Sequence, residues 1–153
     1  MVRQEFRPHQ EILYKSIVGK VTLNQRIRIE ERFFKHKLFP TPSPDLNFNF
    51  RFRYQFIVGI PVAKLSENFP DRKLLLNLGN EIFFNAGKQV TTQIFDLNRM
   101  LISPSLQWSK ALSISLTWNS QFASTPTPGK YIHSNVTWLQ VRHNLDFKKT
   151  PHP

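Results

Sequence analysis

The sequence predicts an all-β protein, an antiparallel up-and-down meander that closes into a transmembrane β-barrel. Apolar and polar residues alternate with a period of two along most of the chain, whereas helical spacing is rare. The alternating segments are long, and turns rich in proline, glycine and polar residues separate them. Long hairpins in series form a meander, and such meanders tend to close into barrels. The segment NFNFRFRYQF, residues 47–56, shows the pattern most clearly, with an aromatic ring at every second position.

The first three strands are expected at 9–17, 20–34 and 46–60. Alternation is weak in 9–17. In 20–34, an apolar row of valine, leucine, isoleucine and phenylalanine alternates with a row of threonine, asparagine, arginine and glutamate. In 46–60, five aromatic rings alternate with asparagine, arginine and glutamine. Successive side chains of a strand point to opposite faces, so each segment predicts one apolar and one polar face.

The remaining four strands are expected at 73–86, 93–108, 111–122 and 132–147. In 73–86, leucine, isoleucine and phenylalanine oppose asparagine and glutamate. In 93–108, methionine, isoleucine, leucine and tryptophan oppose arginine, serine and glutamine. The segment 111–122 alternates without interruption, and 132–147 alternates along its second half. Seven strands are therefore expected in a single domain, 1–153, with 148–153 as a short tail.

Two kinds of turn separate the strands. VGK (18–20) and SK (109–110) are short enough for tight hairpins. The loops at 35–45 and 124–130 are longer and rich in proline. Outer-membrane barrels have short periplasmic turns and long external loops, so we expect the short turns on the periplasmic side. The loop at 63–72 is long for that side.

Which face meets lipid follows from volume, strand length and the placement of the basic residues. Rows of large rings would crowd the interior of a small barrel, whereas pointed outward they meet lipid tails. Several strands exceed the ten residues that a tilted membrane strand needs. The predicted lipid-facing residues are Phe48, Phe50, Phe52, Tyr54, Phe56, Leu112, Ile114, Leu116 and Trp118.

The polar face is predicted to line a lumen. Lysine lies mainly in turns or at their edges, whereas arginine lies mainly within strands. Planar guanidinium groups suit internal networks with carboxylates, so arginine and acidic residues of the strands are expected to pair. The predicted lumen-facing charged network is Arg26, Arg28, Glu30, Arg32, Arg51, Arg53, Glu81, Arg99, Arg142 and Asp146.

The net charge of +11, from 21 Lys+Arg against 10 Asp+Glu, indicates an acidic partner. Outer-membrane lipid, including the phosphates of lipopolysaccharide, fits this expectation. Nucleic acid fits it less well, because recognition sheets usually belong to mixed α/β folds and no helix is evident. Cysteine is absent, which excludes disulfides and Cys-ligated metals.

No enzyme chemistry is expected, with an outer-membrane lipid hydrolase as the alternative. In YIHSNVTW (131–138), His133 and Ser134 are adjacent and point to opposite faces of a strand, so they cannot act together. His133 and Asn135 share a face. The five histidines are scattered without metal-ligand spacing, and no phosphate loop is present. No metal and no cofactor are predicted.

Four motifs resemble, in order, the strands of an uncharacterised family of gram-negative outer-membrane β-barrels, a domain of unknown function. They are EFRPHQEI (5–12), NQRIRIEERFF (24–34), FDLNRMLISPSLQW (95–108) and NVTWLQVRHNLDF (135–147). The resemblance implies an exported outer-membrane protein without carried-over catalytic residues. Members of that family begin with a signal peptide, and residues 1–16 contain none. Bacterial barrels have even strand numbers, so we expect at least one strand to be missing before the first one here.

The expected role is a structural barrel or a narrow passive channel with an arginine-rich lumen. Ion-pair networks rigidify a narrow barrel, which favours the structural role, whereas unpaired arginine would favour the passage of anions. The alternative is a soluble β-barrel that binds a lipid or another apolar ligand inside.

Overall fold

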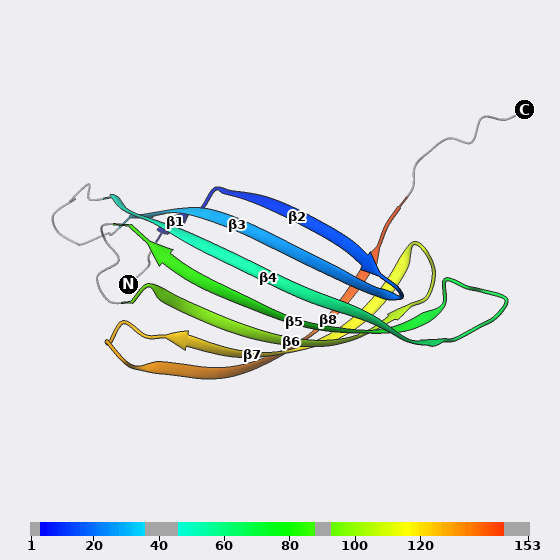
Figure 1. Cartoon of the computed structure of the whole chain (residues 1–153). Coiled ribbons are helices and arrows are strands. Elements are labelled where there is room, and N and C mark those ends of the chain that lie inside the picture. Colours follow the sequence, from blue (N-terminus) through cyan, green and yellow to red (C-terminus); the bar gives the residue numbers. More distant parts are fainter. Residues whose placement is uncertain (1–3, 36–45, 88–92, 146–153) are drawn as a thin grey trace, which may run out of the picture.

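The computed structural model describes residues 4–35, 46–87 and 93–145, which form one antiparallel β-sheet without a helix. The strands are β1 (Gln4–Phe6), β2 (His9–Val18), β3 (Val21–Lys35), β4 (Leu46–Lys64), β5 (Lys73–Ala86), β6 (Phe95–Gln107), β7 (Leu112–Ser124) and β8 (Tyr131–His143). Each strand from β3 onward pairs with the next, and β1 and β2 both pair with β3 (Figure 1). The all-β meander predicted from the sequence is confirmed.

The first strand is interrupted at Arg7–Pro8. Phe6 pairs with Phe33, and His9 pairs with Glu30, so β1 and β2 keep one register along β3. The backbone N–H of Glu31 still donates to the carbonyl of Pro8 at 3.0 Å. Proline has no N–H to return, which breaks the ladder at that point. The described sheet has eight strands, and it matches the predicted seven-stranded meander when β1 and β2 are counted as two parts of one strand, which then begins earlier than the expected 9–17.

Most strand boundaries agree with the predicted ones to within a few residues, and β5 agrees at both ends. The strand predicted at 132–147 is shorter in the structure, because β8 ends at His143 and residues 144–145 are not in a strand. Residues 146–147 lie outside the described residues. The partner strand β7 begins at Leu112, which pairs with His143, and beyond that pair only Asn144 N–H bonds to the carbonyl of Ala111. No partner strand lies beyond this point in the described part of the chain, so the ladder stops there.

The sheet is curled into a trough, a half-barrel that is not closed (Figure 1). Closure would require the first and last strands to pair, and in the described residues β2 and β8 remain edges. The described strands thus form an open half-barrel, and the closed barrel, which the sequence predicts to need at least one further strand, stays a prediction. The two edge strands are exposed along almost their whole length.

The tight turns form as predicted. Val18 pairs with Val21, and Gly19 adopts a positive φ of 61° in the two-residue turn between them. Such hairpin turns need positive φ, which glycine adopts without strain. At the turn 108–111, the hydroxyl of Ser109 accepts hydrogen bonds from the backbone of Ala111 and Leu112.

The two faces of the sheet differ in chemistry. The concave face holds the buried polar residues Glu30, Thr117, Glu81 and Asn119, and the buried phenylalanines Phe34 and Phe83. The convex face carries large apolar side chains that remain exposed, such as Leu116 at 49%. The fold thus buries charge inside the trough and leaves its apolar rows outside.

Candidate functional site: the polar concave face

The register of the strands gathers the charged residues in the trough. Glu30 of β3 pairs with Arg51 of β4, and Glu81 of β5 pairs with Arg99 of β6. Arg53 lies between Arg28 of β3 and Phe83 of β5. Because paired residues point to the same face, alternation along each strand builds rows of charge across the sheet.

Glu81 is the centre of the network and is only 1% exposed. Its Oε1 accepts hydrogen bonds from Arg26 Nη2 at 2.7 Å and from Arg53 Nη2 and Nε at 2.7 and 3.0 Å. Its Oε2 accepts one from Arg99 Nη1 at 3.4 Å. One buried carboxylate thus accepts hydrogen bonds from three arginines of three strands.

Glu30 is the second buried carboxylate, also 1% exposed. Arg53 Nη1 donates to its Oε1 at 2.6 Å. Arg28, Arg51 and Arg7 lie 3.7 to 3.9 Å from its oxygens, within ion-pair range but without a hydrogen bond. Arg53 therefore joins both carboxylates into one network.

Phe83 lies inside this network. Its ring is 3% exposed and lies below the guanidinium carbons of Arg53, Arg99 and Arg51, at 4.5, 5.3 and 6.0 Å from the ring centre. Cations within about 6 Å of an aromatic face are attracted by its quadrupole. Phe83 thus stabilises the arginines that the two carboxylates leave incompletely compensated.

Three further acidic residues pair with arginines at the solvent-exposed edge of the network. Glu5 accepts from Arg7 and Arg32 at 2.8 and 2.7 Å. Glu11 accepts from Arg28 at 2.6 Å, and Asp96 pairs with Arg51 at 2.9 Å. The arginines of the ion-paired set outnumber its carboxylates.

Most of the predicted charged residues meet as expected, and two do not. Arg26, Arg28, Glu30, Arg32, Arg51, Arg53, Glu81 and Arg99 all belong to the connected set. Arg142 lies apart on β8 opposite Ser113, without an ion pair to the described residues. Asp146 lies outside the described residues. Whether this face lines a lumen stays a prediction.

Sequence reasoning missed Phe83 and the acids Glu5, Glu11 and Asp96. A signal for Phe83 was present, because Phe83 and Phe84 are adjacent and one of them must lie on the polar face. Glu5 and Glu11 belong to the weakly patterned first strand. Asp96 lies at the register irregularity of β5 and β6, which simple alternation does not locate.

The predicted lipid-facing residues lie together on the convex face. Neighbouring rings of β4 contact one another, at 4.7 Å between the centres of Phe48 and Phe50 and 6.3 Å between those of Phe50 and Phe52. Across the sheet, Ile102 pairs with Trp118 and Leu116 with Leu139. The apolar surface thus extends over neighbouring strands.

One polar contact on the convex face has a chemical interest of its own. Ser120 Oγ of β7 lies 2.7 Å from His133 Nε2 of β8. Asn135, two residues along, pairs directly with Ser120. The sequence pattern placed His133 and Asn135 on one face of a strand. It could not identify Ser120 as their neighbour, because Ser120 lies on a different strand from His133.

Two negative findings concern the described residues only. No group of three or more metal-ligating side chains is found among them. They also contain no helix of the length and apolar character that a membrane crossing requires.

The fold and its face chemistry define a class: a curled antiparallel β-meander with a buried arginine–glutamate network. Residues 1–132 match the family described as "Protein of unknown function (DUF2490)". The chain belongs to that family. Neither the curated proteins nor the solved structures yield a match.

Proposed function

We propose that this chain is an outer-membrane β-barrel protein without enzymatic activity, with a structural role or that of a narrow passive channel lined by arginine. The observation that carries this proposal is the inverted distribution of its side chains. Glu30 and Glu81 are buried within the trough, whereas Leu116, Phe52 and Trp118 are 40–49% exposed outside it. Contiguous exposed apolar surface indicates a membrane or a partner.

The inverted distribution also argues against a soluble barrel with an apolar ligand. Such a barrel would need a predominantly apolar interior. The trough instead holds a buried arginine–glutamate network, and apolar residues such as Ile57, Leu101 and Trp138 share the rest of its lining with serine, threonine and asparagine. Nucleic-acid binding by stacking would need exposed rings beside the arginines. The rings that contact the network, such as Phe83, are buried, and exposed rings of the aromatic row, such as Phe52, lie on the opposite face.

A membrane barrel leaves no backbone edge unpaired in lipid. The proposal therefore requires that β2 and β8 pair with further strands, supplied by additional chain or by a second copy. Outer-membrane lipid would surround the convex face, and lipopolysaccharide phosphates are expected partners of the lysines at strand ends.

Refolding with and without detergent micelles tests the proposal. Circular dichroism is expected to report β-structure only when micelles are present. A monomeric β-protein that is soluble without detergent would refute the membrane assignment. Conductance in planar bilayers then separates the two roles: the packed network predicts small or no conductance, whereas a channel would give discrete steps.

A second candidate function, hydrolysis of membrane lipids, is favoured by the contact of Ser120 and His133 alone. In this scheme Ser120 Oγ attacks an ester carbonyl as His133 Nε2 takes its proton, the alcohol leaves, and water then hydrolyses the acyl-enzyme. Lipase activity of the micelle-bound protein that disappears in Ser120→Ala would establish it. No activity, with both proteins folded, would leave the contact a structural hydrogen bond.

A further inference from the structure

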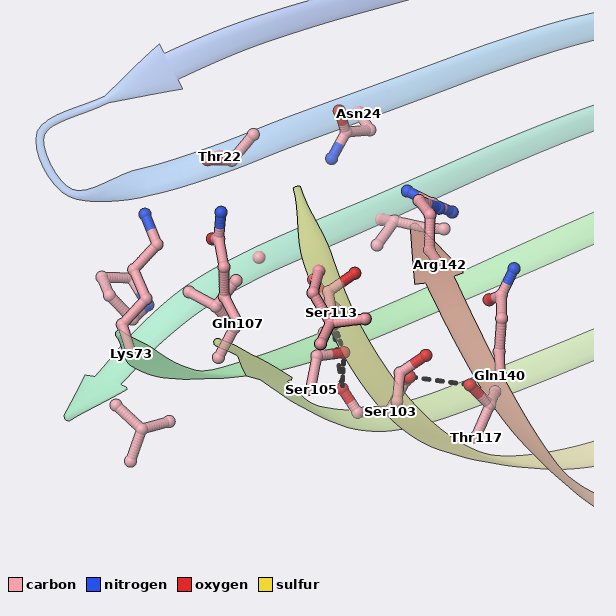
Figure 2. A pocket seen from close by; sticks show the side chains of 18 of the residues that line it. Thr22, Asn24, Lys73, Ser103, Ser105, Gln107, Ser113, Thr117, Gln140 and Arg142 are labelled. Atoms are coloured by element: carbon pink, nitrogen blue, oxygen red, sulfur yellow. Dashed lines mark hydrogen bonds between the residues drawn. The ribbon is translucent and has the colours of Figure 1, made fainter. Parts of the chain in front are cut away.

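The trough has a second half that the arginine–glutamate network does not occupy. A hollow of about 1170 Å³ lies at the end of the sheet that carries the turns at Gly19–Lys20 and 108–111. Its walls come from β2 to β8. Figure 2 shows Lys73 and Gln107 pointing toward β3, which carries Thr22 and Asn24, with Arg142 reaching in from β8. The hollow is large enough for a ligand of several rings.

The charged residues that line this hollow are all cations. Its cationic lining residues are Lys15, Lys20, Lys64, Lys73, Lys110 and Arg142. No aspartate or glutamate lines it, and Glu67 and Asp71 of the adjoining loop stay outside the lining. None of these six cations forms an ion pair within the described residues, in contrast to the arginines of the network. A concave site lined by one sign of charge concentrates ions of the opposite sign.

Two of these lysines oppose each other directly. Lys64 of β4 pairs with Lys73 of β5 in the ladder. Like charges at such positions destabilise a sheet, and among the described residues no carboxylate forms an ion pair with either lysine. Departures of this kind from local stability are expected at functional sites. A bound anion would relieve the repulsion.

The floor of the hollow carries hydroxyl and amide groups between apolar side chains such as Ile57, Leu101 and Trp138. Thr117 and Ser103 hydroxyls lie 2.7 Å apart, and Asn77 Nδ2 donates to Ser105 Oγ at 3.0 Å (Figure 2). Gln107 and Gln140 add amides to the lining. Hydroxyl and amide groups both donate and accept hydrogen bonds, which suits a ligand that itself carries many hydroxyls.

We infer that this hollow binds an anionic, hydroxyl-rich ligand of the phosphorylated-sugar class, either free in solution or as the head of a glycolipid. The cations would hold the phosphate, and the hydroxyl and amide floor would hold the sugar. Inorganic phosphate alone would leave most of the volume empty. The inference goes beyond the proposed function, since it requires only the folded trough and not a membrane.

Calorimetric titration of the folded full-length chain tests the inference, in whichever medium gives β-structure. Glucose 6-phosphate is expected to bind more tightly than inorganic phosphate and glucose. Raising the salt from about 50 to about 200 mM should weaken binding, because screening lowers the attraction of exposed charges. Equal affinity for inorganic phosphate, or binding that salt does not change, would overturn the inference.

Variants locate the site. The double variant Lys73→Gln/Arg142→Gln is expected to bind about tenfold more weakly or worse, since it loses two charge-assisted contacts. Lys130→Gln removes a lysine that lies outside the hollow and should bind like the unchanged protein. Equal losses in both variants would overturn the site. Circular dichroism of each variant confirms that it is folded, which separates a lost site from a lost fold.

A further experiment distinguishes a free sugar phosphate from the head of a glycolipid. Vesicles with lipopolysaccharide are compared with vesicles without it. Binding to the former that is lost in Lys73→Gln/Arg142→Gln but kept in Lys130→Gln, without binding to glucose 6-phosphate, assigns the site to a glycolipid head; binding to glucose 6-phosphate assigns it to a free sugar phosphate. No binding in either arm overturns the inference while leaving the micelle-refolding test of the membrane assignment untouched.

Discussion

Arg53 donates two hydrogen bonds to one carboxylate oxygen of Glu81, at 2.7 and 3.0 Å. Its remaining nitrogen donates to Glu30 at 2.6 Å, so a single side chain on β4 links β3 and β5. Both carboxylates are 1% exposed. Water has almost no access to the oxygens of these two carboxylates and cannot replace Arg53 there. Arg53 is therefore the residue that joins the Glu30 and Glu81 parts of the network.

Arg53→Met should therefore destabilise the fold severely. Removal of one partner of a buried ion pair typically costs about 3–5 kcal/mol. Glu81 keeps its hydrogen bond from Arg26. Glu30 loses its one hydrogen-bonded arginine and keeps only the more distant Arg7, Arg28 and Arg51. The expected loss therefore lies toward the lower end of that range. Urea unfolding in micelles, followed by circular dichroism, measures the free energy of unfolding. Arg28→Met is the control, since its partner Glu11 lies at the exposed rim, and its loss should be clearly smaller. Similar losses would show that Arg53 has no central role.

Much of this network could be predicted from the sequence, because strand period alone assigns each residue to a face. Once Arg53 and Glu81 are assigned to one face of neighbouring strands, their meeting needs only a register within a few residues. The period also predicted the apolar row of β4 and the tight turn at Gly19. These features depend on local pattern, which a single sequence carries.

What could not be predicted depends on register and on irregularities. Ser120 and His133 meet because β7 and β8 pair with one particular offset, and a slip of two residues would separate them. Asp96 enters the network at a register irregularity of the ladder. The first strand continues through Pro8 because β3 offers partners on both sides of the break.

Aspartate at neighbouring positions of β7 tests which face meets lipid. Leu116→Asp introduces a charge on the convex face, where lipid would oppose it, and should prevent or greatly slow insertion into lipid vesicles. Ser115→Asp introduces the same charge on the concave face, in the hollow whose charged lining residues are all cations, and should insert normally. The fraction that migrates as a folded, heat-modifiable band measures insertion. If the protein were soluble, both substitutions would change its stability little, since Leu116 is already half exposed. Equal insertion of the two variants would refute the assignment of the convex face to lipid.

Gly79 should not tolerate a side chain. A Cβ at this position would lie 2.8 Å from Ile57 Cγ1 and 3.0 Å from the carbonyl oxygen of Phe56. The carbonyl belongs to the paired strand and cannot move independently, so Gly79→Ala should lower the free energy of unfolding by about 1–3 kcal/mol. Gly59→Ala is the matched control, because its Cβ would meet the amide end of Asn77, which can rotate. A greater loss at Gly59 would contradict this interpretation.

Replacing one of the opposed lysines should stabilise the protein when no anion is present. Lys64 and Lys73 face each other in the ladder without a carboxylate, and such like-charge pairs cost about 0.2–1 kcal/mol. Lys73→Gln removes the repulsion and should raise the free energy of unfolding in low salt by about that amount. Adding glucose 6-phosphate should reverse the order, because a ligand that binds only the folded state stabilises it in proportion to the logarithm of its concentration over Kd. Lys130→Gln, away from the hollow, should change neither value. If Lys73→Gln destabilised the protein in low salt without ligand, the lysines would serve the fold rather than an anion.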